Sequence, residues 1–265
     1  MRYCRFNFNG VPEYGLIESV AGRDTITRLL LEPPEEAGDL SNLRSRQIDS
    51  MPLSEASLLV PVRPSKIICV GRNYRAHAAE LGNEVPQEPL LFFKPPSALL
   101  ASGQKILRPK LSQRTDFEGE LGVVVGRQCH KLPPDADVRS YILGYTAVND
   151  FTARDLQKKD GQWTRAKGFD TFCPVGPLVT NEIDPWAGVT VETRVNGQVR
   201  QHGNTQDFIF PLDVITRYVA DAMTLVPGDL IATGTPEGVG PAVAGDVVEV
   251  MVEGVGTLRN PVGDE

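Results

Sequence analysis

The chain has 265 residues and a formal net charge of −7, a balance that argues against a surface for nucleic acid or for anionic membranes. No apolar run approaches the ~20 residues needed to cross a bilayer, and the first ten residues lack the apolar core of a secretory signal. The four cysteines (Cys4, Cys69, Cys129 and Cys173) are scattered without a Cys-x-x-Cys pair, which indicates buried thiols in a cytoplasmic protein.

Residues 1–64 are predicted to form a small β-rich domain. Strands are expected at residues 2–8, 13–19 and 24–31, because Asn9-Gly10 and Ala21-Gly22-Arg23 interrupt the apolar pattern. The acidic, proline-containing segment 32–39 is expected to be a loop. Residues 58–65 hold two prolines in extended context and are expected to link this domain to a larger one over residues 65–265.

The larger domain is predicted to be mostly β with a few short helices. Its strands are expected at residues 67–70, 90–93, 116–125, 140–150, 189–195, 199–202, 230–233, 246–252 and 256–258, with Asn196-Gly197 forming a hairpin turn. One helix is expected over residues 73–81, ended by Gly82, and another over residues 211–223, where the apolar side chains form one stripe. Thr152 and Asp155 resemble a capping box that begins a third helix, through Gln157.

The stretch Asp116–Val125, D-F-E-G-E-L-G-V-V-V, carries two carboxylates on one strand face. Residues two apart in a strand point to the same side, so Glu118 and Glu120 lie next to each other. A solvated strand face is the simpler interpretation of this motif alone. A strand expected to end at Asp150 adds a third carboxylate, however, and an all-oxygen set suits Mg²⁺ or Mn²⁺, with Ca²⁺ as a further candidate.

His77 and Glu80 lie three residues apart on the expected helix and therefore share a face. A carboxylate bonded to one ring nitrogen orients the other and raises its basicity, which is the usual composition of a general base. A structural or exposed histidine is the alternative for His77. His130 and His202 lie in polar, turn-like surroundings and are expected at the surface.

The glycine-rich segment T-G-T-P-E-G-V-G, residues 233–240, lacks the Gly-Lys-Ser/Thr ending of a phosphate loop. It is expected to be either a plain turn or a loop whose backbone amides approach a carboxylate. Lys167, just before Gly168, is either an exposed loop lysine or a site residue.

Six motifs in order resemble the fumarylacetoacetate hydrolase family, from about Ser65 to the C-terminus. They are V-G-R-N-Y with A-H-A-A-E-L, F-F-K-P, D-F-E-G-E-L, N-D-F-T-A-R-D-L-Q, K-G-F-D-T-F-C-P-V-G-P and T-G-T-P-E-G-V-G. The resemblance implies an α+β, mostly β fold, a mixed β-sandwich roll with a small N-terminal β-rich domain, commonly assembled as a homodimer.

The resemblance also implies roles for individual residues. Glu118, Glu120 and Asp150 would hold the metal, and His77, Glu80 and Lys167 would be catalytic, with the His77/Glu80 pair on a mobile lid. The implied substrate contacts are Arg72, Tyr74, Lys94, Arg154, Gln157 and Thr235.

Members of this family act on 2-oxo acids that carry a second carbonyl or carboxylate. Their chemistry passes through an enolate, from which hydrolysis of a C–C bond, isomerisation or decarboxylation can follow. We favour hydrolysis of an acylpyruvate-type β-diketo acid, in aromatic catabolism, because a complete His77/Glu80 pair is what water activation needs. The alternatives are a 2-hydroxyhepta-2,4-diene-1,7-dioate isomerase, an oxaloacetate decarboxylase, or a metal-stabilised binding protein without turnover.

Overall fold

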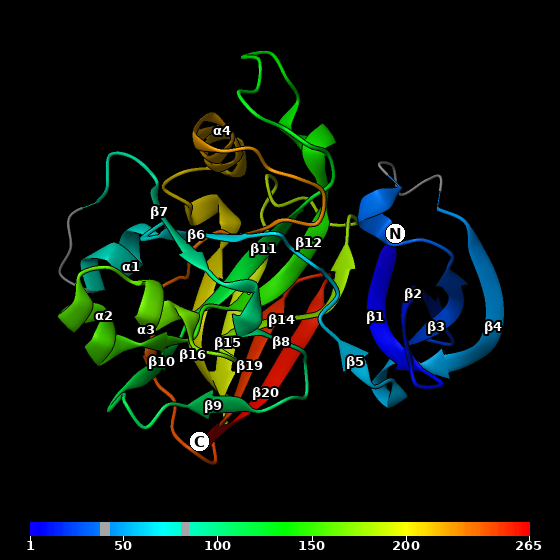
Figure 1. The fold of residues 1–265 in the computed structure, drawn as a ribbon, viewed down its shortest axis with the longest axis horizontal. Helices are drawn as coiled ribbons and strands as arrows, with labels where there is room; N and C mark the ends of the chain where they lie inside the picture. The colour runs from blue at the N-terminus through cyan, green and yellow to red at the C-terminus, as the bar shows by residue number, and fades with distance from the viewer. Residues whose placement is uncertain (38–42, 81–84) are drawn as a thin grey trace.

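The computed structural model describes residues 1–37, 43–80 and 85–265, and Figure 1 shows the chain coloured from N- to C-terminus. Its first strands, β1 (Arg2–Phe8), β2 (Val11–Val20), β3 (Arg23–Leu30) and β4 (Ser45–Pro52), form an antiparallel meander. The three strands expected here are confirmed within two residues at each end. The strand β4 was not expected, because its sequence is polar, and none of its side chains is buried.

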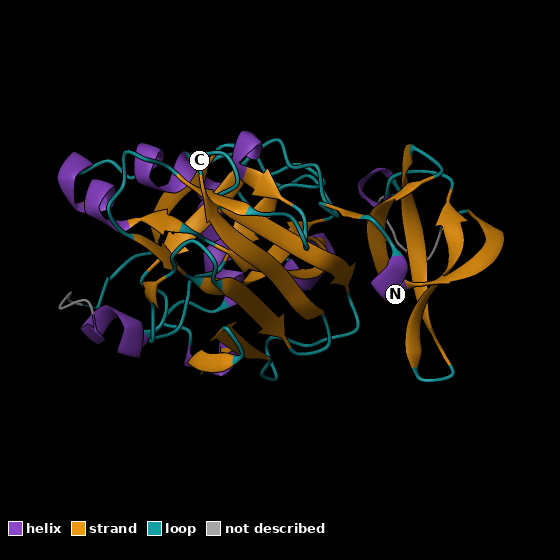
Figure 2. Ribbon diagram, turned by 90° about the horizontal axis from the view of Figure 1, so that it is seen from below, coloured by secondary structure: helices purple, strands orange, loops and turns teal. Residues whose placement is uncertain are grey.

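The segments around this meander agree less fully with expectation. The loop expected over residues 32–39 contains the 3₁₀ turn Pro34–Glu36, and its last two residues lie outside the described residues. The expected linker begins with β5 (Leu58–Leu59), which pairs with β1. Figure 2 shows the meander as a smaller body beside a larger one.

One sheet runs through both bodies in the order β4-β3-β2-β1-β14-β12-β11-β17-β6-β7. The two bodies meet where β1 pairs with β14 (Cys173–Thr180) through the registers Arg2↔Thr180 and Tyr3↔Val179. The other strands of this sheet are β12 (Ile142–Asn149), β11 (Gly119–Val125), β17 (Leu230–Ala232), β6 (Ile67–Gly71) and β7 (Leu90–Lys94), with β8 (Leu99–Leu100) beside β14.

A second sheet packs on the first and buries the largest apolar cluster between them. It consists of β16 (Gln198–Asn204), β15 (Thr190–Val195), β19 (Val247–Val252), β20 (Gly256–Asp264) and β9 (Ile106–Arg108). Leu121 and Val123 of β11 share this cluster with Val191 and Val250 of the second sheet. The layers are those of a β-sandwich, because both sheets turn apolar side chains inwards.

The hairpin expected at Asn196-Gly197 joins β15 and β16, and both turn residues have positive φ, 52° and 78°. Such φ values are what a two-residue hairpin turn requires. The expected C-terminal helix is α4 (Leu212–Ala222), and it buries Leu212, Ile215 and Val219 in the cluster between the sheets.

Three short helices lie around one end of the sandwich: α1 (Arg75–Glu80), α2 (Arg154–Asp160) and α3 (Thr164–Gly168) (Figure 1). Leu81 and Gly82, expected to end the first of them, lie outside the described residues. The predicted capping box is wrong. The Thr152 hydroxyl donates to the carbonyl of Asp150, and the Asp155 carboxylate accepts from Ser112 and the amide of Gln113.

A three-stranded sheet, in the order β13 (Thr152–Ala153), β10 (Thr115–Phe117) and β18 (Gly240–Pro241), completes the β structure. Further 3₁₀ turns lie at Leu53–Glu55, Pro96–Ala98, Val138–Tyr141 and Thr205–Asp207. All four cysteines are buried free thiols, as expected. Among the described residues, no helix has the length and apolar character that crossing a membrane requires.

Candidate active site

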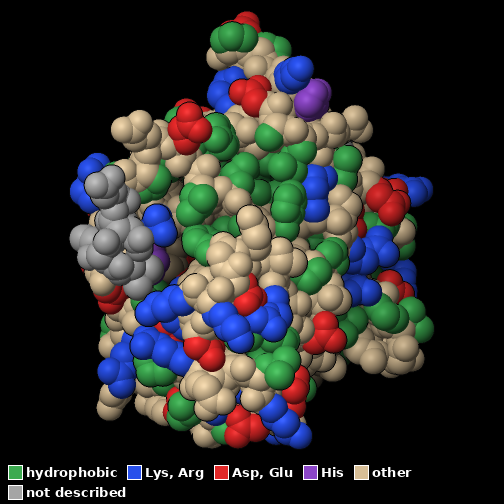
Figure 3. All heavy atoms as spheres, turned by 60° about the vertical axis from the view of Figure 1, so that its left-hand side comes forward, with side chains coloured by type: hydrophobic (Ala, Val, Ile, Leu, Met, Phe, Trp, Pro, Cys, Tyr) green, Lys and Arg blue, Asp and Glu red, His purple; other side chains and the backbone are tan. Residues whose placement is uncertain are grey.

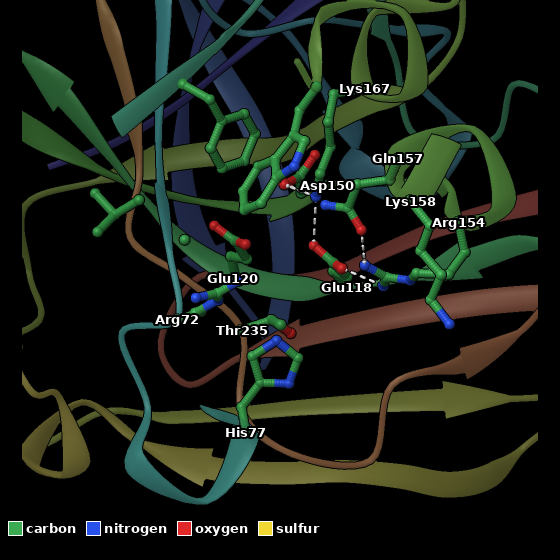
Figure 4. Close-up of a pocket in the computed structure, with 14 residues that line it drawn as sticks. Arg72, His77, Glu118, Glu120, Asp150, Arg154, Gln157, Lys158, Lys167 and Thr235 are labelled. Atoms are coloured by element: carbon green, nitrogen blue, oxygen red, sulfur yellow. Dashed lines mark hydrogen bonds and ion pairs between the residues drawn. The ribbon is translucent and has the colours of Figure 1, made fainter. Parts of the chain in front are cut away.

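Three carboxylates meet at the end of the central strands. Glu118 lies between β10 and β11, Glu120 is on β11, and Asp150 directly follows β12. The antiparallel pairing of β11 with β12 and the bond from the Asp150 amide to the Glu118 carbonyl, 2.8 Å, hold the two strand ends together. One oxygen of each carboxylate lies within 4.8 Å of the others, and all three residues are buried (Figure 4). The solvated strand face considered from the motif alone is therefore wrong.

Buried cations surround two of these carboxylates. Lys167 Nζ donates to Glu118 Oε2 at 2.7 Å and to Asp150 Oδ2 at 2.6 Å, while Lys94 Nζ donates to Asp150 Oδ1 at 2.6 Å. The Arg154 guanidinium bonds the second oxygen of Glu118. Burial by itself would raise the pKa of Glu118, but Lys167 and Arg154 outweigh it and hold that pKa well below its usual range.

Glu120 is the exception in this cluster. Its Oε2 accepts a hydrogen bond from the Gly234 amide at 2.9 Å, and among the described residues no side-chain cation pairs with it. Burial raises the pKa of Glu120 well above its usual range, and the neighbouring charges of Asp150 and Glu118 raise it further.

This donor set fits a hard divalent cation. Three converging carboxylates offer oxygen ligands only, the preference of Mg²⁺, Mn²⁺ and Ca²⁺, and Glu120 is a buried carboxylate in need of positive charge. The cluster therefore matches the metal ligands expected from the sequence.

His77 of α1 is 4% exposed and faces the same cavity as the carboxylates. Its Nδ1 lies 3.4 Å from Glu80 Oε2, and the Glu80 carboxylate also accepts from the Gly238 amide at 3.1 and 3.2 Å. Burial lowers the pKa of His77 below its ordinary value, against the opposing effects of Glu118 and Glu80. The imidazole is thus kept neutral, the form that can accept a proton.

The glycine-rich loop after β17 does bring backbone amides to carboxylates, as one of the two interpretations of its sequence expected. Those carboxylates are the chain's own, since the Gly234 amide bonds Glu120 and the Gly238 amide bonds Glu80. The loop therefore connects the acidic cluster to the helix that carries His77.

A cavity of about 290 Å³ opens above the acidic centre, and Figure 4 shows the side chains that point into it. Nine residues expected in the site line it: Arg72, His77, Glu118, Glu120, Asp150, Arg154, Gln157, Lys167 and Thr235. Glu80 does not line it and acts behind His77.

Lys94 and Tyr74, both expected to contact substrate, do not line this cavity. The Lys94 ammonium lies behind Asp150 and donates hydrogen bonds to that carboxylate and to the carbonyl of Phe151. The Tyr74 ring packs edge-on against Phe208, and its buried hydroxyl has no hydrogen-bond partner among the described residues. Their contact with a substrate therefore stays a prediction, because sequence motifs show which residues gather, whereas packing decides which of them reach the surface of the cavity.

Thr235 does line the cavity, but its hydroxyl is already engaged. It donates to the Gly119 carbonyl at 2.8 Å and accepts from Gln201 Nε2 at 2.7 Å. The expected bond from this hydroxyl to a substrate carboxylate would replace the one that it donates to Gly119, because a carboxylate only accepts and the hydroxyl has a single proton.

Several cavity residues were not identified from the sequence. Phe92 and Trp163 form an aromatic wall, with their ring centroids 5.1 Å apart and Lys167 Nζ 4.9 Å from the Phe92 ring. Lys158, on α2 one turn after Arg154, also lines the cavity. Phe92 belongs to the F-F-K-P motif and could have been found there, and Lys158 could have been found from its position four residues after Arg154, a spacing that places both on one face of a helix.

Comparison with known proteins gives consistent matches. A family model described as fumarylacetoacetate (FAA) hydrolase, C-terminal, matches residues 66–263. The 2,4-didehydro-3-deoxy-L-rhamnonate hydrolase of Sphingomonas sp. (strain SKA58) is 38% identical over 278 residues, covering 100% of this chain and 96% of the relative.

Solved structures agree with this match. That of 5-carboxymethyl-2-hydroxymuconate delta-isomerase from Mycobacterium smegmatis has 41% identity and a TM-score of 0.89, with 100% of both chains covered. Fumarylpyruvate hydrolase from Pseudomonas aeruginosa, in complex with Mn²⁺ and pyruvate, has 32% identity and a TM-score of 0.71, covering 78% of this chain and 91% of that one. The expected mostly β fold is confirmed.

Proposed function

Because the chain belongs to the fumarylacetoacetate hydrolase family, we propose that it is an enzyme that hydrolyses a C–C bond in an acylpyruvate-type β-diketo acid. One observation carries the proposal: the buried, neutral His77 with Glu80 behind it faces the same cavity as Glu118, Glu120, Asp150 and Lys167. A binding protein without turnover would have no need of this arrangement.

Glu118, Glu120 and Asp150 would hold Mg²⁺ or Mn²⁺, with Ca²⁺ as a further candidate. When bound, the ion supplies a Lewis acid for the carboxylate and keto oxygens of a 2-oxo acid. The presence of Mn²⁺ and pyruvate in the related fumarylpyruvate hydrolase supports this part of the proposal.

The protein's own groups account for the proton transfers. His77 takes a proton from water as the water oxygen adds to the carbonyl carbon distal to the 2-oxo acid. The C–C bond then breaks, leaving a carboxylic acid and the enolate of pyruvate, and His77 returns its proton to the enolate carbon. Burial would lower the pKa of Lys167, but Asp150 and Glu118 outweigh it, so this residue stays an ammonium and can stabilise the developing negative charge.

Isomerisation is the second candidate, because the isomerase from M. smegmatis matches the whole chain at 41% identity. It would use the same base and the same enolate, with His77 moving a proton from one carbon to another and no water added.

A substrate panel distinguishes these reactions. Acetylpyruvate, fumarylpyruvate, oxaloacetate and 2-hydroxyhepta-2,4-diene-1,7-dioate are ranked by kcat/KM with and without Mg²⁺. Release of pyruvate together with the matching carboxylic acid supports hydrolysis. A shifted double bond without fragmentation supports the isomerase instead, release of CO₂ supports a decarboxylase, and no turnover of any substrate would leave a binding protein.

We also propose that the protein is a cytoplasmic homodimer. The family resemblance supports the dimer, and the four buried free thiols suit a reducing compartment. Sedimentation of the protein at micromolar concentration tests the dimer, and a monomer there would contradict it.

A further inference from the structure

Lys158 is a cavity residue whose charge the protein does not use. It follows Arg154 by four residues on α2, so both side chains lie on one face of that helix, and both line the cavity. Figure 4 shows the Lys158 side chain beyond Arg154, away from the acidic centre, and Lys158 is exposed. Among the described residues, no carboxylate forms an ion pair or hydrogen bond with its ammonium group.

The other two cations on that side of the cavity already bind carboxylates of the protein. Arg154 bonds Asp116 Oδ2 at 2.9 Å, Gln157 Oε1 at 2.7 Å and the carboxylate of Glu118. Lys167 bonds both Glu118 and Asp150. A second anionic group on a substrate would therefore have to share Arg154 or Lys167 with the protein's own carboxylates, whereas Lys158 has no such partner among the described residues.

Arg72 is placed to serve the other end of a substrate. Figure 4 shows it on the Glu120 side of the cluster, opposite Lys158. Its φ of 57° is uncommon for a residue other than glycine, and the side chain of the next residue, Asn73, holds the backbone there through bonds with Thr233 and Phe210. A substrate lying across the centre would have Arg72 near its 2-oxo acid and Lys158 near its far end.

We propose that Lys158 is a specificity-determining residue that binds a second, distal carboxylate, so that the preferred substrates are dicarboxylic 2-oxo acids. The inference rests on the proposed function and adds the chemical class at the far end of the substrate. The aromatic wall of Phe92 and Trp163 suits a flat, unsaturated carbon chain between the two carboxylates.

The test uses two substrates that differ only at the far end. Fumarylpyruvate ends in a carboxylate, and crotonylpyruvate carries a methyl group in its place. With Mg²⁺ present, the unaltered protein should prefer fumarylpyruvate in kcat/KM. Lys158→Met should reduce that preference about tenfold, the scale of one charge-assisted hydrogen bond at a partly solvated site. The loss should fall on fumarylpyruvate, with crotonylpyruvate changed less than about twofold.

Two control variants isolate the charge at this position. Lys159→Met removes the next lysine of the same helix, which does not line the cavity, and should leave the preference unchanged. Lys158→Arg keeps a positive charge at the same place and should keep most of the preference. A preference unaffected by Lys158→Met, or reduced equally by Lys159→Met, would overturn the proposal.

A binding measurement separates this proposal from the proposed function. Trp163 lines the cavity, and Trp186→Phe makes it the one tryptophan of the chain. In that protein, with His77→Ala added to stop turnover, Trp163 fluorescence reports the affinity for each acid. If neither acid is turned over by the unaltered protein, the proposed function fails, yet a Lys158-dependent preference in binding would still support the inference. Equal affinity for the two acids, or no binding of either, would overturn it.

Discussion

Glu118 and Glu120 show how far two identical residues of one motif can differ. Both are buried on the same short stretch, yet two cations neutralise Glu118, whereas a single backbone amide contacts Glu120. The difference arises because Arg154 and Lys167 reach the cluster from helices α2 and α3, on the Glu118 side. The two carboxylates should therefore have different effects on stability, although both are proposed ligands of the metal.

The first prediction compares Glu118→Gln with Glu120→Gln in metal-free protein. Glu118→Gln leaves Lys167 and Arg154 buried with less negative charge and should cost about 3–5 kcal/mol of unfolding free energy, the usual cost of breaking a buried ion pair. Glu120→Gln removes a buried carboxylate that Glu118 and Asp150 repel, and the amide oxygen of Gln can still accept from Gly234. It should therefore leave the unfolding temperature unchanged or raise it.

Calorimetry completes this comparison. Both variants should lose tight binding of Mg²⁺ or Mn²⁺, and so should Asp150→Asn, because each removes a charged ligand. Equal losses of stability for the two glutamate variants would contradict the difference in charge around Glu118 and Glu120. Unchanged metal affinity in both variants would contradict their role as metal ligands.

The second prediction concerns the pH dependence set by His77. Because burial lowers its pKa in the folded protein, its neutral form should persist below the ordinary histidine value of about 6.5. Activity should fall only when the pH drops through this lower folded-state pKa. Stability should already decrease as the pH falls from ~6.5 towards that pKa, because in this range the unfolded chain binds more protons at this residue than the folded protein does, and the loss is complete below it. The acidic limb of kcat/KM against pH gives the measurement.

Two variants, Glu80→Gln and His77→Ala, test whether the acidic limb of the pH profile reports the protonation of His77. Glu80 raises the pKa of His77, so Glu80→Gln should move the acidic limb to still lower pH. His77→Ala should lower kcat by ~10²–10⁴, the usual contribution of a general base, with metal affinity nearly unchanged. An acidic limb that does not respond to Glu80→Gln would assign it to another group.

At the scale of elements, the sequence predicts strands whose local pattern is clear, and it misses strands that only tertiary packing makes possible. Alternating apolar residues and turn signals located most strands, and the β12 end brought Asp150 to the site as expected. Strand β14 was missed because Pro174, Gly176 and Pro177 argue against a central strand. The structure accommodates Pro177 where the register with β12 shifts between Tyr145 and Ala147.

The same distinction explains which positions in the site could not be predicted. The motifs identified the acidic residues, because the two-residue spacing of Glu118 and Glu120 places both on one face of a strand. They could not show that Lys94 lies behind Asp150, since its position depends on how β7 packs beside β6 at the far edge of the sheet. Lys158 was missed although its four-residue spacing from Arg154 places the two on one helix face, because only the orientation of α2 shows that this face lines the cavity.

The third prediction concerns α1, the short helix that carries His77. The expected lid covered residues 74–88, of which residues 81–84 lie outside the described residues. Six helical residues can bury little surface against the ~1–2 kcal/mol per residue cost of ordering backbone. The Glu80 carboxylate, bonded to the Gly238 amide, fastens the helix to the glycine-rich loop. Amide exchange at residues 75–80 should therefore be fast in free protein and slow when oxalate is added with Mg²⁺.

Hydrogen-exchange mass spectrometry tests this lid, with Glu80→Gln as the variant that weakens its attachment. The variant should exchange faster at residues 75–80 than the unaltered protein, both with and without oxalate. Equal protection with and without oxalate in the unaltered protein would mean that α1 does not act as a lid.

At the scale of the whole molecule, the N-terminal meander shares its core with the larger body. Phe6 and Ile26 belong to the same apolar cluster as Leu178 and Val255, and Tyr3 belongs to another cluster with Val175 and Val179. The strand pairing between β1 and β14 adds main-chain bonds across the same boundary. The meander should therefore unfold together with the catalytic part, although its sequence suggests a separate domain.

The last prediction tests this coupling with a substitution far from the cavity. Phe6 is fully buried, and Phe6→Ala should cost about 3–5 kcal/mol because it leaves a hole in a core shared by both bodies. In Trp186→Phe protein, Trp163 fluorescence reports unfolding at the active site, and Phe6→Ala should lower that transition as well as the calorimetric one. Val11→Ala, at a strand position 55% exposed, should leave both unchanged. Two calorimetric transitions, with the Trp163 signal unaffected by Phe6→Ala, would instead show that the meander folds independently.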